Sequence, residues 1–553
     1  MVGELIALAI VTALGHNDFM LLIFPPVAKP CEPPAGIAKL AGALIAHDIS
    51  STMLDANFEG LLFLLQQPKL ANDTWTRRSV KNMSNNLAAL RDARTYRSLS
   101  RYSRAVQDLQ RVLEVSAKGA QDVLGLADYH THNLSPVRSA DLITTAMYPE
   151  KNLFYPYFSR QLPKIIEECC FPQVRTSVLL KEGFGGKERQ EDKDDEEQAK
   201  KPIIGFSLNY LSQALCTFAM IGYVRSSFPL VKIVLGGGLV SSWMKRPGFK
   251  NPFGGLVDHL ICGPGEGPLL DLLGVKELKQ KHFEPDYASL PLQAYLSPGF
   301  ILPYSGSSGC YWSKCSFCPE TAEDNLYAAV PIAQAMTDLQ SLVKKTQPVL
   351  IHLLDNAISP ALMHALAYKP LGVPWYGFAR FGKDLLNKEY CMALKRSGCT
   401  MLKLGLESGD QGVLDRLQKG IDLGEASVVL KNLKQAGIAS YIYLLFGTPA
   451  ETITEARRTL EFVVQHADVI SYLNLAIFNM PLCSEEAETY ETEQFYEGDL
   501  SLYTGFTHPQ GWDRKIVRQF LDTEFKRHPA VAAILKKDPP IFTSNHAAFF
   551  SRL

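Results

Sequence analysis

The stretch Cys310-Tyr-Trp-Ser-Lys-Cys315-Ser-Phe-Cys318 places three thiols within nine residues. It follows Ser305-Gly-Ser-Ser-Gly309, which is typical of an irregular loop. Cube-shaped iron–sulfur clusters are usually held by four cysteines, so a loop with three leaves one iron open to another ligand. Structural zinc also uses closely spaced cysteines but needs four ligands, and no Cys or His follows within the next thirty residues. The loop alone favours an iron–sulfur cluster, while zinc with a remote fourth ligand stays open.

The overall composition is that of a soluble globular enzyme. The chain has 553 residues, of which 46% are hydrophobic and 20% charged, and its net charge is −1. This length indicates two or three domains, and the balanced charge provides no general attraction to nucleic acids or anionic membranes. The cysteines outside the loop are scattered in apolar contexts, which is typical of reduced thiols in a cytoplasmic protein. The apolar segment at residues 4–14 is too short to cross a bilayer, and we expect either a packed helix there or extra residues from an upstream start codon.

Residues 1–275 alternate between strand and helix patterns. Apolar runs predict strands at 20–24, 51–55, 202–207, 231–235 and 256–262, with helices at 34–46, 211–228 and 268–273. This alternation predicts a doubly wound parallel sheet, whose ligands bind at the carboxyl ends of the strands. Two inserts are expected, a helical one at about 74–175 and a flexible charged loop at about 181–201.

Distinctive loops follow several of these predicted strands. They are Pro25-Pro26, Ser207-Leu-Asn209, Gly236-Gly-Gly238 and Gly263-Pro-Gly-Glu266. Glycines without side chains let the backbone approach a large ligand closely. The sequence therefore predicts a ligand site at this edge of the sheet.

Residues 276–299 are rich in proline and read as a linker, after which the strand–helix alternation resumes over 300–485. Strands are predicted at 349–354, 375–380, 400–406, 440–446 and 469–478, with polar residues at their carboxyl ends, where the active sites of parallel barrels lie. Residues 486–553 begin with acidic residues and continue into a helical pattern at 513–537. Such an extension can close a pocket or simply pack on the barrel, and its candidate residues are Tyr503, His508, Trp512 and His546.

Together these features resemble the radical S-adenosylmethionine (SAM) enzymes that carry a cobalamin-binding domain. Residues 300–485 carry the resemblance through the cysteine loop with Phe317, Leu404-Gly-Leu-Glu-Ser-Gly409 and Phe446-Gly-Thr-Pro-Ala-Glu451; residues 18–60 and 200–275 carry it through the strand-end loops. The cysteine spacing is four then two residues, where the family usually has three then two. The Asp-x-His-x-x-Gly motif that ligates cobalt is absent, since no histidine lies between Phe24 and Ile45.

The resemblance implies an α/β chain: a Rossmann-like cobalamin-binding domain, a partial (β/α)6 radical SAM barrel and a small, mostly helical C-terminal extension. It implies that Cys310, Cys315 and Cys318 hold a [4Fe–4S] cluster. The residues implied to contact SAM are Phe317, Asp355, Asn356, Arg380, Glu407, Ser408, Gly447 and Thr448. Those implied to contact cobalamin are Pro25, Pro26, Ser207, Asn209, Gly236, Gly237, Gly238, Gly265 and Glu266. Arg380 has the alternative of pairing with a structural carboxylate, and Glu407 that of capping the following helix.

The implied activity is formation of a 5′-deoxyadenosyl radical and C-methylation of an unactivated carbon of an unknown substrate. The alternatives are a non-methylating cyclisation or rearrangement with the same cofactors, and a zinc-stabilised binding protein without catalysis. The implied electron donor is a ferredoxin or flavodoxin, and the reduced cluster implies a low-oxygen cytoplasm. A small molecule, a peptide or a protein are all open as substrates, whereas a nucleic acid is disfavoured because no basic domain is appended.

Overall fold

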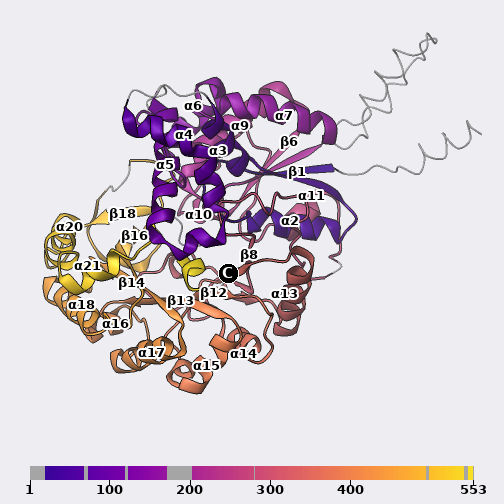
Figure 1. The fold of residues 1–553 in the computed structure, drawn as a ribbon. Helices are drawn as coiled ribbons and strands as arrows, with labels where there is room; N and C mark the ends of the chain where they lie inside the picture. The colour runs from indigo at the N-terminus through magenta and orange to yellow at the C-terminus, as the bar shows by residue number, and fades with distance from the viewer. Residues whose placement is uncertain are drawn as a thin grey trace, which may run out of the picture.

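The computed structural model describes residues 19–67, 73–118, 122–170, 202–278, 280–493, 497–540 and 546–551. Two parallel β-sheets, one from each half of the sequence, organise this part of the chain (Figure 1). The helix expected at the N-terminus and the charged loop expected at 181–201 lie outside the described residues.

The first sheet has the doubly wound order predicted from the sequence. Its strands lie in the order β2-β1-β5-β6-β7 and are parallel throughout: β1 Phe19–Phe24, β2 Ser50–Asp55, β5 Ile203–Ser207, β6 Lys232–Gly236 and β7 His259–Leu260. By chain order this is 2-1-3-4-5, in which the strand order reverses beside β1 and ligands bind at that reversal. The last strand is shorter than the predicted run at 256–262.

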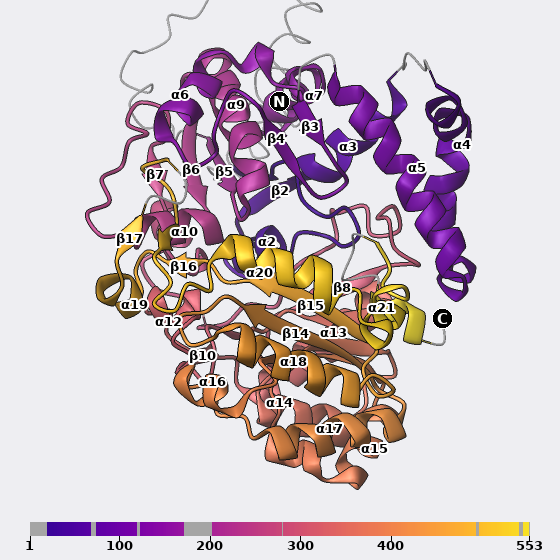
Figure 2. The ribbon, with the colours of Figure 1, turned by 90° about the vertical axis from the view of Figure 1, so that its left-hand side faces the viewer.

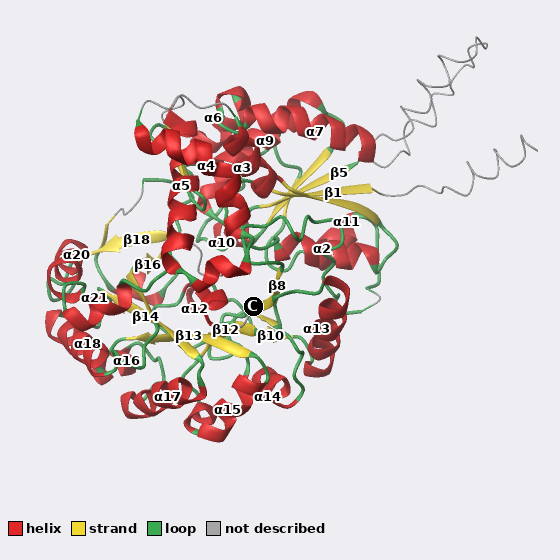
Figure 3. Ribbon diagram, in the orientation of Figure 1, coloured by secondary structure: helices red, strands yellow, loops and turns green. Residues whose placement is uncertain are grey.

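Both faces of β1 are buried, as a central strand of a parallel sheet requires. Met20 and Leu22 pack toward the side of α2 (Ala35–Ile45) and α11 (Glu266–Leu272). Leu21 and Ile23 pack toward the side of α3 (Ala56–Gln66) and α9 (Leu211–Ser227). Figure 3 shows these two helical layers on opposite sides of the strands.

The insert is helical as predicted, and it also contains a short β-hairpin that the sequence did not reveal. Its elements are α4 Thr74–Leu90, α5 Leu99–Ala117, the antiparallel pair β3 Asp122–Leu124 and β4 Tyr129–Thr131, α6 Ser139–Met147 and α7 Tyr155–Cys170. Helices α4 and α5 form a hairpin at one side of the molecule (Figure 2). Its Tyr102 hydroxyl donates to the carbonyl of Pro540, 3.3 Å away, so the insert reaches the C-terminal segment.

The second sheet follows chain order, β8-β11-β12-β13-β14-β15, and is also parallel. Its strands are β8 Ile301–Tyr304, β11 Leu350–Leu353, β12 Trp375–Ala379, β13 Cys399–Glu407, β14 Ala439–Phe446 and β15 Tyr472–Ile477. Helices follow the strands and cover one face: α13 Ile332–Thr346, α14 Pro360–Tyr368, α15 Lys388–Arg396, α17 Leu423–Ala436 and α18 Ile453–Gln465 (Figure 1).

The segment between the halves is packed rather than extended through solvent. Phe283, Tyr287 and Leu290 are buried in a core that is continuous with α2 and with the helical side of the second sheet. A side chain on Gly42 of α2 would overlap the carbonyl oxygen of Glu284, so backbone meets backbone here. The two halves are therefore joined by a close-packed contact.

The C-terminal part adds a small antiparallel sheet to the helices expected there. It is formed by β16 Met480–Pro481, β18 Tyr503–Phe506 and β17 Thr492–Glu493, followed by α20 Arg514–Phe520 and α21 Pro529–Leu535. Within the described ranges, every helix falls short of the length or the apolarity that crossing a membrane demands.

Candidate functional site

The cysteine loop leaves and rejoins the second half of the chain at a short antiparallel ladder. Strand β9 (Ser307–Ser308) pairs with β10 (Ala328–Ala329) at its base. Gly309 follows β9 with φ +68°, and a Cβ there would lie 2.6 Å from the carbonyl oxygen of Leu326. Only glycine satisfies both constraints without strain, so Gly309 sets the direction in which the chain enters the three-cysteine segment.

The middle of the loop is fixed by contacts with residues 417–420. The Ser316 N–H donates to the carbonyl of Leu417 (3.2 Å), and the Trp312 indole N–H donates to the carbonyl of Gln418 (3.0 Å). Gly420 lies under the Trp312 ring, where a Cβ would overlap the indole. Protein contacts alone therefore hold the loop against the segment that follows the central strand β13 of the second sheet.

The three thiols differ in exposure. Cys315 is buried, whereas Cys310 and Cys318 are partly exposed. Burial raises the pKa of Cys315 and of Cys318, and the cations Lys419 and Arg380 oppose this rise at Cys315. Among the residues that the structure describes, no three His, Cys, Asp or Glu side chains converge as ligands of a single metal ion. The assignment of these cysteines to a cluster stays a prediction.

Asp355 and Asn356, at the carboxyl end of β11, both hold the cysteine loop. The Asp355 carboxylate accepts from the Gly306 N–H (3.0 Å) and from the Ser307 hydroxyl (2.5 Å) and is almost fully buried. The Asn356 side chain donates to the carbonyl of Gly309 at 3.3 Å. Burial raises the pKa of Asp355, and the hydrogen bonds that it accepts from Ser307 and Gly306 counteract the rise. Both residues thus lie at the predicted site, with loop backbone as their observed partners.

Arg380 and Glu407 meet around Lys419, a residue that the sequence analysis missed. The Lys419 ammonium pairs with the Glu407 carboxylate at 2.7 Å and lies 5.4 Å from the centre of the Phe317 ring. The Arg380 guanidinium lies 4.1 Å from the Trp312 ring and donates to the Lys419 carbonyl. Glu407 has φ +67°, a conformation that is rare for a residue with a side chain and that often marks functional sites. A lysine in an ordinary turn carries no sequence signal, which explains the omission.

Ser408, Gly447 and Thr448 are buried at neighbouring strand ends, among structural partners. The Ser408 hydroxyl lies 3.2 Å from that of Thr459 on α18. The Gly447 N–H donates to Glu451 at 2.6 Å. The Thr448 carbonyl accepts from His508 (3.0 Å), while its hydroxyl has no partner among the described residues. Their role toward SAM stays a prediction.

Glu451 is the most strongly perturbed carboxyl in this region. Burial raises its pKa to about 7, against the hydrogen bonds that it accepts from the Gly447 N–H and the Trp512 indole N–H. His508 and Trp512 both belong to the C-terminal extension, so two of its four candidate residues pack against this strand end. The carboxyl is therefore largely neutral at acidic pH and ionises near neutrality.

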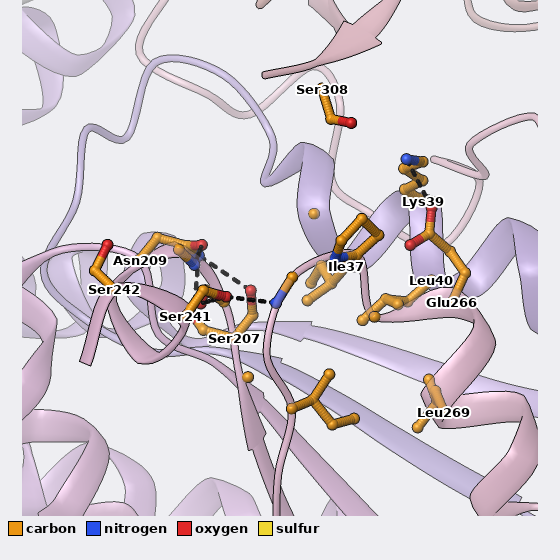
Figure 4. A pocket seen from close by; sticks show the side chains of 18 of the residues that line it. Ile37, Lys39, Leu40, Ser207, Asn209, Ser241, Ser242, Glu266, Leu269 and Ser308 are labelled. Carbon is orange, nitrogen blue, oxygen red and sulfur yellow. Dashed lines mark hydrogen bonds and ion pairs between the residues drawn. The ribbon is translucent and has the colours of Figure 1, made fainter. Parts of the chain in front are cut away.

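A pocket of about 760 Å³ lies at the carboxyl ends of the first sheet (Figure 4). Its volume is in the range of ligand sites. The predicted cobalamin contacts that line it are Ser207, Asn209, Gly236, Gly237, Gly238, Gly265 and Glu266. Apolar side chains also line it, among them Met20, Leu22, Ile37, Leu40, Val234 and Leu269.

The polar side of the pocket is held by strand-end hydrogen bonds. The Asn209 amide donates to the Ser207 hydroxyl (3.0 Å) and accepts from the Gly238 N–H (2.9 Å), and Figure 4 shows both side chains beside the pocket. Gly237 has φ +112°, and a Cβ there would overlap the Leu208 carbonyl. Ser241, on α10 (Gly238–Met244), accepts from the Gly263 N–H at 2.8 Å. The loop of Gly236, Gly237 and Gly238 (the glycine loop) thus has a fixed backbone conformation at the wall of the pocket.

Pro25 and Pro26 are the exceptions, since neither lines this pocket. Both are buried, and the Pro25 carbonyl accepts from the Gln213 side chain at 2.7 Å. The chain turns away from the pocket at this point and carries Glu32 to His352 on β11, at 3.0 Å. The prediction that these prolines contact the pocket ligand is therefore not supported by their placement.

The opposite wall of the pocket comes from the cysteine loop. Ser308 and Gly309 precede Cys310, and Glu320, Glu323 and Asn325 follow Cys318; all five line the pocket. Lys245, at the end of α10, donates to the Glu323 carbonyl (3.0 Å) and to the Asn325 side chain, which ties the two walls together. One pocket therefore contacts both the glycine loops of the first half and the residues flanking the thiols.

No protein-family model matches the chain. Among curated proteins, an uncharacterized methyltransferase of Pyrococcus horikoshii is 23% identical over 188 residues, which are 32% of this chain and 40% of that protein. The chain thus spans less than half of the curated relative that it matches.

Two solved structures match the chain over more of its length. The radical SAM methyltransferase TsrM of Kitasatospora setae, with tryptophan substrate and a SAM analogue bound, matches with a TM-score of 0.50 and 11% identity over 96% of this chain and 90% of TsrM. The cobalamin-dependent SAM radical enzyme OxsB, with aqua-cobalamin and SAM bound, matches with a TM-score of 0.47 and 13% identity over 82% of this chain and 53% of OxsB. The likeness to TsrM shows a shared fold, in agreement with the predicted resemblance.

Proposed function

We propose that this chain is a cobalamin-dependent radical SAM enzyme that methylates an unactivated carbon of its substrate. The observation that carries the proposal is the shared pocket, whose walls are the strand-end glycine loops and the residues on either side of the three cysteines. A methyl carrier and a radical source must face the same substrate atom, and a pocket that adjoins the cysteine loop meets this requirement.

The residues present fit the implied groups. Three cysteines in one pinned loop provide three of the four thiolates that a [4Fe–4S] cluster usually has, which leaves one iron for SAM. Gly36, Gly238 and Gly263 have no side chain and so leave room along the pocket. A Cβ added at any of them would meet nothing closer than 3.5 Å. The apolar lining of the pocket suits a flat heterocycle such as the nucleotide tail of cobalamin.

When bound, the cluster and SAM supply a 5′-deoxyadenosyl radical that removes a hydrogen atom, and cobalamin supplies the methyl group. The chain's own residues orient and enclose these groups. Asp355 and Asn356 fix the cysteine loop, while Glu407, Lys419 and Arg380 place charge beside it. Asn209, which donates to the Ser207 hydroxyl, accepts from the Gly238 N–H and so fixes the glycine loop. The C-terminal extension covers the end of β14 and helps to exclude water.

The test is anaerobic purification with hydroxocobalamin, followed by quantification of iron, sulfide, zinc and cobalt per chain. We expect about four irons and roughly one cobalt per chain, the latter if the shared pocket takes one corrin. Iron without cobalt would favour a radical SAM enzyme whose first half has another role, and zinc without iron would exclude the radical chemistry.

Methylation is then separated from cyclisation or rearrangement with SAM that carries a deuterated methyl group. A deuterated methyl in the product supports methyl transfer, whereas 5′-deoxyadenosine without a labelled product supports the non-methylating alternative. A ferredoxin or flavodoxin is proposed as the electron donor in the cytoplasm, and either carrier can be supplied in the assay.

A further inference from the structure

The face of the second sheet that the helices do not cover changes character along its strands. Toward their amino ends it is closed by buried side chains, namely Ile301, Leu350, Tyr376, Met401, Tyr441, Tyr472 and Ala547 of the C-terminal segment. Toward the carboxyl ends the next inward positions are partly exposed: Phe378, Gly405, Glu407, Tyr443, Asn474 and Ala476. Solvent therefore reaches this face from the end at which the cysteine loop lies.

Lys403 lies at the boundary between these two zones. It is on β13, two inward positions before Glu407, and is only 3% exposed. Its ammonium lies 5.2 Å from the centre of the Tyr376 ring and 4.8 Å from that of Phe378. Its one hydrogen-bond partner among the described residues is His352 Nε2, at 3.3 Å. An ammonium has three donors, so most of its capacity is unused.

His352 contacts the Lys403 ammonium, and Glu32 in turn contacts His352. The His352 ring stacks on Tyr376 with centroids 4.4 Å apart, and its Nδ1 lies 3.0 Å from the Glu32 carboxylate. With Nδ1 donating to Glu32, Nε2 is left to accept from Lys403. Glu32 comes from the loop after β1, so the first half of the chain helps to fix this lysine.

Among the described residues, no carboxylate is recorded in direct contact with the Lys403 ammonium. Glu407 is paired with Lys419, and Glu32 reaches Lys403 only through the intervening His352 ring. Burial lowers the pKa of Lys403 to about 8, with Lys29 acting in the same direction and Glu32 and Cys31 against it. A buried charge without an ionic partner is costly, and an incoming anion relieves that cost.

We propose that Lys403 anchors an anionic group of the substrate, a carboxylate or a phosphate, and that His352 and Glu32 are positioning residues for it. The anion site itself is argued from the contacts of Lys403. Only the statement that the anion belongs to the substrate rests on the proposed function. The test of the anion site uses neither iron nor cobalt, so a failure of one proposal is distinguishable from a failure of the other.

Small aromatic anions provide the probe, because Tyr376 and Phe378 flank the ammonium. Thermal stabilisation of the full chain is measured with benzoate, phenyl phosphate and the neutral benzamide, with chloride holding the ionic strength constant. Benzoate and phenyl phosphate have different head groups on the same ring, so their ranking identifies carboxylate or phosphate as the preferred anion. We expect stabilisation by at least one of them and none by benzamide.

Two matched variants locate the effect. Lys403→Met removes the charge and keeps the length, whereas Lys345→Met makes the same change at an exposed lysine paired with Glu284 on the same half of the chain. We expect the apparent Kd for the anion to rise at least about tenfold in Lys403→Met and to stay unchanged in Lys345→Met. Equal weakening in both, no weakening in either, or no stabilisation of the parent protein by any anion overturns the proposal.

A measurement on the unmodified protein covers the case in which Lys403→Met does not fold. Reductive methylation at pH 8 labels neutral amines, and peptide mass spectrometry reports the labelled fraction at Lys403. We expect the preferred anion to slow labelling at Lys403 several-fold while benzamide leaves it unchanged. Labelling that is insensitive to every anion contradicts the proposal.

Discussion

Single residues in the cysteine loop do separable jobs. Cys315 is the buried thiol, Gly309 sets the entry of the chain, and Trp312 and Ser316 fix the loop to residues 417–420. The fold of the loop therefore does not depend on any one thiol, whereas the proposed cluster binding does. A variant that loses a thiol is expected to keep its structure and lose its metal.

Cys315→Ala is predicted to abolish iron binding and SAM cleavage while leaving the unfolding temperature within a few degrees of the parent. The matched control is Cys262→Ala, which removes an exposed thiol from the first half of the chain. Iron and sulfide are quantified after anaerobic reconstitution, and 5′-deoxyadenosine is measured by chromatography. Full iron content in Cys315→Ala would remove this residue from the ligand set.

Glu451 is predicted to make the protein less stable as the pH rises. Burial raises the pKa of Glu451 in the folded state to about 7. The contribution of the neutral carboxyl to the free energy of unfolding is therefore fully present below about pH 4.5 and is lost as the pH passes 7. The shift corresponds to a loss on the order of 3 kcal/mol above pH 8. Glu451→Gln keeps the shape of the neutral acid and removes this loss.

Thermal unfolding of the parent and of Glu451→Gln is compared at pH 5.5, 7.0 and 8.5. Asp55, whose pKa burial also raises to about 7, titrates in both proteins, so the difference between them isolates Glu451. The variant is expected to gain stability relative to the parent as the pH rises. A difference that is independent of pH would show that Glu451 is ionised throughout.

At the scale of elements, the glycine loop after β6 is the part of the first sheet whose proposed role a single substitution can test most directly. Gly237→Ala places a side chain where φ is +112° and where the Leu208 carbonyl lies. We predict a loss of cobalamin retention of at least tenfold, with iron content unchanged, because the loop must move and Gly238 loses its hydrogen bond to Asn209. Gly254→Ala, where an added Cβ has nothing within 4 Å, is the control.

Most strands of both sheets follow from the sequence because their apolar runs are uninterrupted. β8 was missed because Pro303 breaks the pattern, and proline is tolerated there since β8 lies at a sheet edge. The hairpin β3–β4 and the sheet of β16, β17 and β18 were missed because strands of two to four residues have too few positions to show a periodicity.

The sequence placed the predicted site residues at strand ends, but it did not indicate which partners their side chains contact. Gly236, Gly237 and Gly238 line the pocket as expected. Asp355 was assigned to SAM, yet its observed partners are Gly306 and Ser307, which no local pattern indicates. Lys403 was a visible signal, since a charged residue inside an apolar strand is unusual, but its partner His352 is 51 residues away.

At the scale of the whole molecule, the close contact between α2 and the 280–300 segment keeps the two halves in one orientation. Gly42→Val is predicted to force the Glu284 backbone away and to destabilise the protein by about 2 kcal/mol. Limited proteolysis is expected to cut within 276–299 faster in the variant than in Gly254→Ala. Unchanged cleavage and unchanged stability would mean that the halves are held together elsewhere.

The protein contacts of the cysteine loop also bear on the order in which the proposed cofactors load. Residues within 308–309 and 320–328 flank the thiols and close one side of the space that we assign to cobalamin. Asp355, Asn356 and the backbone of Leu417 hold this loop through protein groups alone. We therefore expect protein purified without iron to keep both walls of the pocket and to take up the corrin before any iron is loaded.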